Sequence, residues 1–224
     1  MTFLKAENIS KSYMSGETER EVLSDLGLNI EKGDMTLIIG PSGSGKTTLL
    51  NLLGGIDRPD SGKIVVDNRN ISHASDDELR KHRAEYVGFI FQFYNLMPTL
   101  SAIENVELGC EIRDWSKEKV KKESEKYLKR VGLKKELEKF PQQLSGGQQQ
   151  RVAIARALAK HPKIIFGDEP TGNLDEETSM QIIELLRDVN HRFGTTMVIV
   201  SHDRELRQYA DNIYELRKGR LNEV

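Results

Sequence analysis

A glycine-rich segment that ends in lysine and threonine carries the clearest chemistry in the sequence. Residues 40–47 read G-P-S-G-S-G-K-T and match the pattern G-x-x-x-x-G-K-[ST] in full. Glycines let successive backbone N–H groups turn toward one point, and a helix N-terminus adds positive potential there. We therefore expect a polyphosphate cradle in which Lys46 neutralises the β- and γ-phosphates and the Thr47 hydroxyl binds Mg²⁺.

The flanking residues supply the strand and the helix that such a phosphate loop needs. Residues 36–39 predict a buried strand, and residues 45–53 predict a helix. A Gly- and Ser-rich loop that merely turns the chain is the alternative, but it would require neither this strand nor the lysine and threonine. The nucleotide-binding residues predicted from this segment are Gly40, Ser42, Gly43, Ser44, Gly45, Lys46, Thr47 and Thr48.

Two acidic residues follow another apolar run. Residues 164–167 read I-I-F-G and precede Asp168 and Glu169, which places both acids at the carboxyl edge of a sheet, where ligands of α/β folds bind. Asp168 is expected to hold Mg²⁺ through water, and Glu169 to orient and polarise the attacking water. A glutamate is ionised at neutral pH without any special environment. The alternative is that the two acids only cap the helix expected after Pro170.

His202 ends the last apolar strand that we expect, in the run V-S-H-D. A histidine at a strand end is often an ordinary polar loop residue. Its place beside two other strand-end sites favours contact with the γ-phosphate, so we count His202 with Glu169 and Lys46 among the predicted catalytic residues.

The rest of the sequence indicates which elements position these groups. Residues 2–39 hold short apolar or alternating runs with turn signals at Gly16 and Gly33, typical of strands and hairpins. Residues 93–158 look helical, and the last third alternates buried strands with a helix. Strands that alternate with helices imply a parallel sheet with helical layers. We therefore expect an α/β core that a helical insert interrupts.

One helix of the insert is expected to begin after Ser116 and to end at Gly132. Its many lysines are interspersed with Glu118, Glu123 and Glu125. This mixture indicates a solvated helix face rather than a patch for a membrane surface or an acidic partner.

Composition excludes several classes of protein. The chain has 224 residues, of which 33 are Lys or Arg and 35 are Asp or Glu, so nucleic acid is not expected as a partner. The single cysteine, Cys110, can form neither an internal disulfide nor a zinc site, which fits a reducing compartment. No apolar run approaches the ~20 residues that cross a bilayer, and residues 1–8 do not resemble a secretory signal. We therefore expect a globular protein that acts in the cytoplasm.

A second predicted helix N-terminus lies in the middle of the chain. Residues 144–148 read L-S-G-G-Q, and a helix that continues through Leu158 follows Ser145 and the two glycines. Such a helix start can receive an anion. Taken alone, a flexible linker before a helix would be the alternative interpretation.

The complete ordered set resembles the ATPases of the ABC (ATP-binding cassette) family, whose signature is L-S-G-G-Q. The resemblance covers almost the whole chain and thins over residues 101–140. Residues 92–96, 148–151 and 171–175 are similar to the subgroup of macrolide exporters, lipoprotein-releasing systems and cell-division ATPases (MacB/LolD/FtsE type). Gly167 stands where the family often has a larger apolar residue. This difference is expected to affect local packing more than catalysis. The members of the set are the phosphate loop, Gln92, the signature, Asp168, Glu169, Asp175 and His202.

The resemblance implies an α/β fold built on a P-loop NTPase (RecA-like) core, with an N-terminal antiparallel β subdomain and an inserted helical subdomain. Residues 1–92 and 159–224 would form the nucleotide-binding core with the β subdomain. Residues 93–158 would form the helical subdomain that carries the signature.

The resemblance also implies roles for single residues. Tyr13 matches the aromatic residue that stacks on adenine, although the residue alone suggests a half-buried strand tyrosine. Gln92 matches the glutamine that senses Mg²⁺ and moves with the membrane partner, so the expected metal set is Thr47, Gln92 and Asp168. Asp175 matches the loop that crosses the dimer seam. The residues implied to face the γ-phosphate held by a second subunit are Ser145, Gly146, Gly147 and Gln148.

The function implied by the resemblance is that of the ATP-hydrolysing subunit of an ABC transporter, with ATP and Mg²⁺ as cofactors. ATP would close a head-to-tail homodimer and hydrolysis would reopen it, at the inner face of the cell membrane. The motion would pass through the region near Gln92 to a separate transmembrane permease. Export or extraction of a lipophilic, peptide, antibiotic or lipoprotein substrate is expected.

Other functions stay open at this point. The same ATPase could serve a transmembrane signalling complex of the cell-division type. A DNA- or ribosome-acting ABC ATPase would need a long coiled coil or a second cassette, and this chain has neither. A GTPase or a small-molecule kinase would have no use for the signature, and the guanine motif N-K-x-D is absent.

Overall fold

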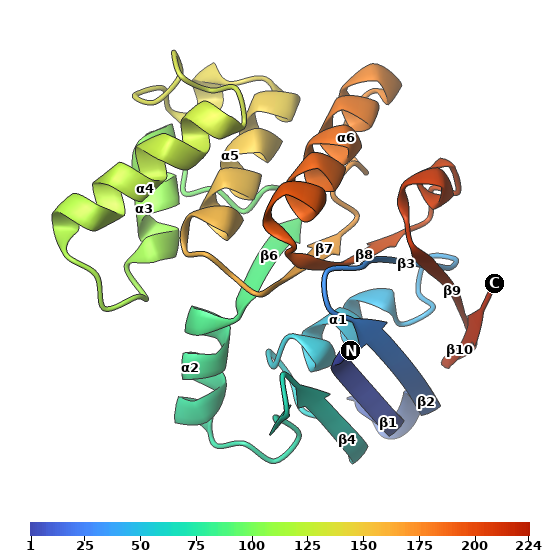
Figure 1. Cartoon of the computed structure of the whole chain (residues 1–224). Coiled ribbons are helices and arrows are strands. Elements are labelled where there is room, and N and C mark those ends of the chain that lie inside the picture. The colour runs from blue at the N-terminus through green and yellow to red at the C-terminus, as the bar shows by residue number, and fades with distance from the viewer.

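The first of two sheets is antiparallel and is built mainly by the N-terminal hairpin (Figure 1). The computed structural model describes residues 1–224, apart from the side chain of Ser15. Gly16 lies in the turn of the hairpin, so the strands and hairpin predicted for residues 2–39 are confirmed. In spatial order the strands are β2 (Thr18–Glu31), β1 (Thr2–Ser15), β4 (Ser61–Val66) and β5 (Arg69–Asn70).

Alternation of apolar and polar residues explains why this sheet covers only one side of the molecule. In β2 the side chains of Leu26, Leu28 and Ile30 are buried, whereas Gly27 and Asn29 between them are exposed. Successive strand residues point to opposite faces, so one face packs on the core and the other meets solvent.

The second sheet has five parallel strands and one antiparallel edge strand. Its central strands are apolar on both faces, and every residue of β3 and β8 is buried. Parallel strands with this pattern need a layer on each side. In spatial order the strands are β10 (Arg220–Glu223), β9 (Asn212–Arg217), β3 (Met35–Ile39), β8 (Thr196–Ser201), β7 (Ile164–Asp168) and β6 (Val87–Phe91).

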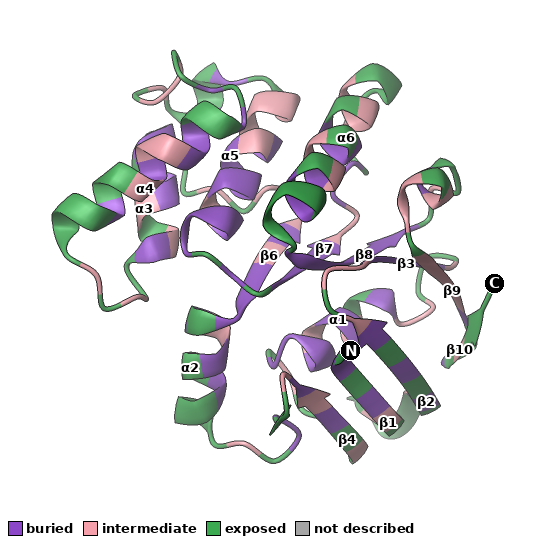
Figure 2. Ribbon diagram, in the orientation of Figure 1, coloured by how far each residue is buried: buried purple, intermediate pink, exposed green. Residues whose placement is uncertain are grey.

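Helices supply these layers (Figure 2). The leucines of α1 pack between the two sheets, against the antiparallel sheet and one face of the parallel strands. Helices α3, α4, α5 and α6 form the core on the other face. None of the helices in the described part of the chain has the length and apolar character needed to cross a membrane. The helices are α1 (Lys46–Leu53), α2 (Asp76–Glu85), α3 (Ala102–Cys110), α4 (Lys117–Arg130), α5 (Gly146–Ala159) and α6 (Glu176–Phe193), with short 3₁₀ turns at Pro141–Gln143 and Glu205–Tyr209.

Polar side chains fix where the helices begin. Ser101, Ser116, Ser145 and Asp175 each accept a hydrogen bond from the backbone N–H three residues further on. Such caps satisfy amides that have no partner within the helix. The predicted start of α4 at Ser116 is therefore confirmed, and the chain leaves this helix next to Gly132, which has a φ of 86°.

Several elements were not predicted from the sequence. These are α2, β4, β5, β9 and β10, so His202 does not follow the last strand of the chain. Strand β9 is mostly half-buried and β10 mostly exposed, which leaves no clear apolar period to detect. The predicted insert of residues 93–158 contains α3, α4 and all of α5 except Ala159. The division into core and insert stays a prediction.

The space beside Gly167 is filled by the side chain of Ile199, its neighbour in the sheet. Gly167 pairs with Ile199 across β7 and β8, and a β-carbon at Gly167 would lie 2.6 Å from Ile199 Cδ1. The isoleucine side chain therefore occupies the space that a larger residue at position 167 would need.

We predict that Phe166→Ala lowers the free energy of unfolding by roughly 3–5 kcal/mol, because it leaves a large cavity in the core. Phe166 is fully buried in β7 and lies against Phe89, with ring centroids 5.6 Å apart. The matched control is Phe193→Ala at the exposed end of α6, with an expected loss below about 1 kcal/mol. Urea unfolding measures both, and equal losses would contradict the packing described.

Candidate functional site

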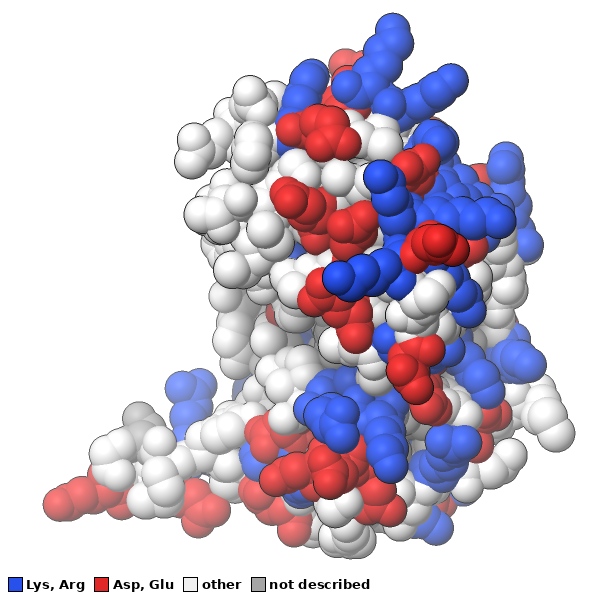
Figure 3. Space-filling view, turned by 90° about the vertical axis from the view of Figure 1, so that its left-hand side faces the viewer, with Lys and Arg blue, Asp and Glu red and all other residues white. Residues whose placement is uncertain are grey.

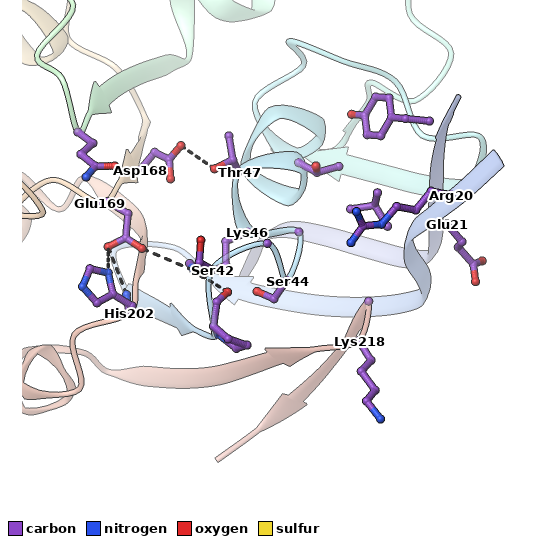
Figure 4. A pocket seen from close by; sticks show the side chains of 18 residues that line it. Arg20, Glu21, Ser42, Ser44, Lys46, Thr47, Asp168, Glu169, His202 and Lys218 are labelled. Carbon is purple, nitrogen blue, oxygen red and sulfur yellow. Dashed lines mark hydrogen bonds and ion pairs between the residues drawn. The ribbon is translucent and has the colours of Figure 1, made fainter. Parts of the chain in front are cut away.

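A cavity of 1060 Å³ opens where the phosphate loop meets the carboxyl ends of the parallel strands (Figure 4). It brings together most of the residues that the sequence singled out, from parts of the chain far apart in sequence. Its lining comprises Tyr13, Arg20, Glu21, Val22, residues 41–48, Gln92, Asp168, Glu169, His202, Lys218 and Gly219.

The phosphate loop turns sharply into α1. Gly43 and Gly45 have φ values of 74° and 102°, which favour glycine. Gly45 is the N-cap of α1 and provides no side-chain cap, so the first amides of the helix stay available to a ligand. The loop therefore presents backbone N–H groups and a helix N-terminus to the cavity, as an anion site requires.

Lys46 lies at the start of α1, and its side chain is buried against the loop. Its Nζ donates to the carbonyl oxygens of Gly40 at 2.8 Å and Pro41 at 3.2 Å, and lies 3.6 Å from Glu169 Oε1. Lys46 is only 7% exposed. The loop thus holds the positive charge of Lys46 between itself and the strand-end glutamate.

Thr47 and Asp168 form a pair of oxygen ligands. The Thr47 hydroxyl donates to Asp168 Oδ2 at 2.9 Å. Burial raises the pKa of Asp168 above its usual range, and the nearby Glu169 charge raises it further, whereas the Thr47 hydrogen bond acts in the opposite direction. Asp168 therefore carries its charge at an energetic cost that a bound cation would relieve.

Glu169 is held in an uncommon backbone conformation beside His202. Its φ is 48°, a region that costs a residue with a side chain about 1–2 kcal/mol. Its amide donates to Val200 O at 2.9 Å, and its Oε2 accepts from the Ser201 hydroxyl at 3.1 Å and from the His202 amide at 3.2 Å. His202 Nδ1 lies 2.9 Å from the same oxygen. These contacts fix the carboxylate in the cavity wall.

Gln92 follows β6 and is joined to the loop before α6. Its side-chain Nε2 donates to Asn173 Oδ1 at 3.2 Å, and Asn173 Nδ2 donates back to the Gln92 carbonyl at 3.0 Å. Gly172 lets the two approach, because a β-carbon there would lie 2.9 Å from Gln92 Nε2. The Gln92 side chain is thereby tied to a loop that starts near Glu169.

Tyr13 lies on β1 at the other end of the cavity and is 40% exposed. Its hydroxyl donates to Asp57 Oδ2 at 2.7 Å, and Lys11 Nζ lies 5.1 Å from its ring centroid. Burial and the Asp57 hydrogen bond raise the pKa of Tyr13 to about 12. The ring is held in place with part of its surface open, so it differs from a tyrosine packed in the core.

The signature does not line this cavity. Ser145 caps α5 in a reciprocal arrangement, in which its amide donates to Gln148 Oε1 at 3.0 Å and the Gln148 amide donates to Ser145 Oγ at 3.3 Å. Gly147 packs closely on α6, since a β-carbon there would lie 2.5 Å from Thr178 Cγ2. The structure therefore keeps this second helix N-terminus apart from the phosphate loop of the same chain.

Asp175 also lies outside the lining of the cavity and caps α6. Its Oδ1 accepts from the Thr178 amide at 2.9 Å, and its Oδ2 accepts from the Thr178 hydroxyl at 2.8 Å. The alternative that Asp168 and Glu169 cap this helix is wrong, because α6 begins six residues after Pro170 with its own cap.

Sequence reasoning missed some of the residues that build the site. Ser201 and Asn173 were not predicted, although each hydrogen-bonds a predicted site residue. Their positions beside His202 and inside the loop 171–175 were the only signals available. Arg20, Glu21, Val22, Lys218 and Gly219 also line the cavity, and no local motif marks them.

Acidic and basic side chains alternate over the face that contains α4 (Figure 3). Lys129 pairs with Glu125 at 3.0 Å, and Lys126 pairs with Glu123. The prediction of a solvated, mixed-charge helix face is therefore confirmed.

Comparison with known proteins decides the family. Residues 23–172 match the family model described as ABC transporter. The chain belongs to the ABC transporter family. This ABC chain is similar to the lipoprotein-releasing system ATP-binding protein LolD of Alcanivorax borkumensis, with 43% identity over 99% of the chain and 97% of that protein. It is 44% identical to the macrolide export ATP-binding/permease protein MacB of Pasteurella multocida, over 97% of the chain but 33% of that protein.

A solved structure agrees with the whole fold of this ABC chain. The dimeric post-hydrolysis structure of the ATP-binding cassette MJ0796, bound to ADP and Pi, matches with a TM-score of 0.90 at 42% identity. The match covers 99% of the chain and 97% of that structure. The predictions of the family, of the α/β P-loop fold and of an ABC ATPase that powers transport are confirmed.

The opposite environments of Asp168 and Asp175 give a pH-dependent prediction for the nucleotide-free protein. The pKa of Asp168 is higher in the folded state than in the unfolded state, so the folded state holds this proton more tightly. The fold therefore loses stability as pH rises from the ordinary aspartate pKa through the raised one. Asp168→Asn should therefore stabilise the fold at pH 7, by at most about 1 kcal/mol because solvent screens the site, and the gain should shrink toward pH 4.

Asp175 supplies the matched control. The Thr178 amide lowers the pKa of Asp175, so its stabilising charge acts above the usual carboxyl range and is lost as pH falls through the lowered pKa. Asp175→Asn should destabilise the fold at pH 7, and the difference should fade in acid. Urea unfolding at several pH values checks both signs, and a destabilising Asp168→Asn would contradict the burial argument.

Proposed function

We propose that two copies of this ABC ATPase close head to tail around two ATP molecules, with the phosphate loop of one copy and the signature of the other on the same γ-phosphate. One observation carries the proposal: the chain has two helix N-termini suited to an anion, but only the one at Lys46 lines its own nucleotide cavity. Ser145 is exposed and open to a second chain. The dimeric state of the MJ0796 cassette supports this arrangement.

The side chains in the cavity have distinct tasks in this proposal. The loop amides and Lys46 bind the β- and γ-phosphates, and Lys46 exchanges its carbonyl partners for phosphate oxygens. Glu169 orients the attacking water and accepts its proton, since its carboxylate is fixed by Ser201 and His202. His202 stays within reach of the γ-phosphate. Asp175, at the start of α6, lies at the seam between the two copies.

The oxygen ligands in the cavity fit Mg²⁺. Thr47 and Asp168 present a hydroxyl and a carboxylate in contact, and Gln92 adds an amide oxygen in the same cavity. Among the described residues no group of three or more His, Cys, Asp or Glu is arranged to hold a metal by itself. This suits Mg²⁺, which takes one or two carboxylates together with phosphate oxygens. When bound, Mg²⁺ would neutralise charge that develops on the phosphates.

The surface after Gln92 suits contact with a membrane permease. Phe93 is 71% exposed and Met97 is 48% exposed, which is unusual for large apolar side chains. Tyr94, Leu96 and Pro98 complete this segment. We place the ATPase on the cytoplasmic face of the cell membrane, where hydrolysis in the cavity would move the segment against the permease. Export or extraction of a lipophilic, peptide, antibiotic or lipoprotein substrate fits the resemblance to LolD and MacB.

The first test uses Glu169→Gln, which keeps the shape of the side chain but removes the base. We expect hydrolysis to fall by at least a hundredfold and an ATP-dependent dimer to accumulate, as measured by gel filtration with and without ATP. The nucleotide-free variant should stay monomeric at the same concentration. A variant that remains monomeric in saturating ATP would contradict the proposal.

Mixed dimers in this Glu169→Gln background test whether each site takes residues from both copies. Chains with Lys46→Ala are mixed with chains with Ser145→Arg. If each site spans two chains, the mixed dimer keeps one intact site, with Lys46 from one chain and Ser145 from the other. We expect dimers that retain about one ATP. The reciprocal mixed dimer, purified away from parent homodimers, joins the parent with a chain that carries both changes and should have no intact site. The reverse pattern would mean that one chain supplies both groups.

The Tyr13 ring provides a separate prediction on affinity. Tyr13→Ala should weaken ATP binding roughly 5- to 100-fold, because stacking on a base contributes about 1–3 kcal/mol. Tyr13→Phe keeps the ring and loses only the hydrogen bond to Asp57, so its affinity should stay within about threefold. Equilibrium titration with a fluorescent ATP analogue measures both. Unchanged binding by the alanine variant would remove Tyr13 from the site.

A further inference from the structure

The segment that follows Gln92 has an unusual backbone. Tyr94 and Asn95 are consecutive and have φ values of 60° and 50°. Residues with side chains rarely adopt this left-handed region, and two in a row persist only when the surroundings hold them. The Tyr94 amide donates to Phe91 O at 3.2 Å and the Asn95 amide donates to Phe93 O at 2.5 Å, which fixes the amide side of the turn.

Arg156, in the third turn of α5, holds the other side. Its guanidinium donates to Tyr94 O at 2.7 Å and to Asn95 O at 2.5 Å. The planar fork of an arginine can meet two neighbouring carbonyl oxygens at once, whereas the ammonium of a lysine is a point charge without this geometry. Arg156 therefore binds the two carbonyl groups of the left-handed residues themselves.

The residues around Arg156 hold its side chain against the segment that follows Gln92. Burial lowers the pKa of Arg156, and none of the ion pairs formed by the described residues involves it. Its stem passes against Gly109 of α3, where a β-carbon would lie 2.6 Å from Arg156 Cγ. A half-buried guanidinium whose partners are two carbonyl groups is costly unless its geometry is kept.

The same segment also contacts the beginning of α5. A β-carbon at Gly146 would lie 2.9 Å from the Tyr94 hydroxyl, so the tyrosine side chain packs on the signature. Gly146 and Arg156 are ten residues apart, about 15 Å along the helix. The chain after Gln92 is thus fastened to α5 at two well-separated points, the first turn by Tyr94 and the third turn by Arg156.

At its other end the segment reaches the nucleotide cavity. Gln92 lines the cavity, and two residues separate it from Asn95. A displacement of Gln92 therefore acts on Tyr94 and Asn95 first, and through Arg156 on the whole of α5. Ser145 caps that helix and must move with it.

We propose that Arg156 is a positioning residue that makes the signature follow Gln92, so that nucleotide in the cavity of one chain sets where that chain offers Ser145 to its partner. The inference rests on the proposed dimer function. Arg156 lies outside the cavity lining, so its replacement should alter the closing of the dimer but not the binding of ATP to a single chain.

The test compares Arg156→Lys with Arg151→Lys in the Glu169→Gln background. Arg151 is a matched control because it also lies on α5 and donates to Val131 O at 3.0 Å and Gln181 Oε1 at 3.2 Å, both away from Gln92. Titration of dilute monomers with a fluorescent ATP analogue gives the affinity of one chain. Sedimentation velocity in saturating ATP gives the dissociation constant of the dimer.

We expect Arg156→Lys to weaken the ATP-bound dimer at least tenfold while monomer affinity for ATP stays within about twofold. Arg151→Lys should leave both quantities within about threefold. Equal losses of dimer affinity in the two variants, or a parallel loss of monomer ATP affinity, would assign Arg156 a merely structural role and overturn the inference. A parent that forms no dimer with ATP would overturn the proposed function and this inference together.

Gly109→Ala provides a second route if Arg156→Lys does not fold. The added methyl group would lie 2.6 Å from Arg156 Cγ and 2.9 Å from Arg156 O, so it displaces the stem and the adjoining turn of α5 without changing the charge of Arg156. Alanine also favours the helix α3 more than glycine does. The same selective weakening of the dimer is expected. A Gly109→Ala protein that closes as tightly as the parent overturns the inference.

Discussion

Parallel pairing of β3, β8 and β7 is the constraint on which the site depends. Because the three strands run in one direction and in fixed register, their carboxyl ends place the phosphate loop, the two acids and His202 at one edge. The close contacts there, such as Thr47 with Asp168 and His202 with Glu169, are consequences of that register. A slip of β7 by one residue would turn Asp168 to the opposite face of the sheet.

In the proposed dimer, two of the helix N-termini of each chain bind phosphate, those of α1 and α5. The start of α1 has a glycine at its cap and lines the cavity, whereas the start of α5 is stabilised by the reciprocal bonds of Ser145 and Gln148 and does not line it. In the proposed dimer, each chain therefore holds one nucleotide and completes the site of the other chain. The coupling that we propose between these tasks runs through Gln92, which contacts the loop before α6, and through Tyr94, which contacts the helix α5.

Local motifs could be predicted because their chemistry and conformation lie in a few adjacent residues. The phosphate loop, the cap at Ser116 and the strand that ends in Asp168 are of this kind. The roles of three other residues could not be predicted, because they arise from the order of strands and from a hairpin at the far end of the chain. These residues are Ser201, Asn173 and Lys218. The half-exposed strands β9 and β10 were missed because their residues lack an apolar period.

The pair formed by Gly167 and Ile199 directly underlies the acids at the end of β7. Since the isoleucine side chain fills the space above the glycine, the two positions behave as one packing unit with a fixed combined volume. Chimaeras with a relative that carries a bulky residue at the first position must exchange both. If only one of the two residues were exchanged, the core beneath Asp168 would be either overpacked or left with a cavity. Either change would displace Asp168 and Glu169, although neither acid had been substituted.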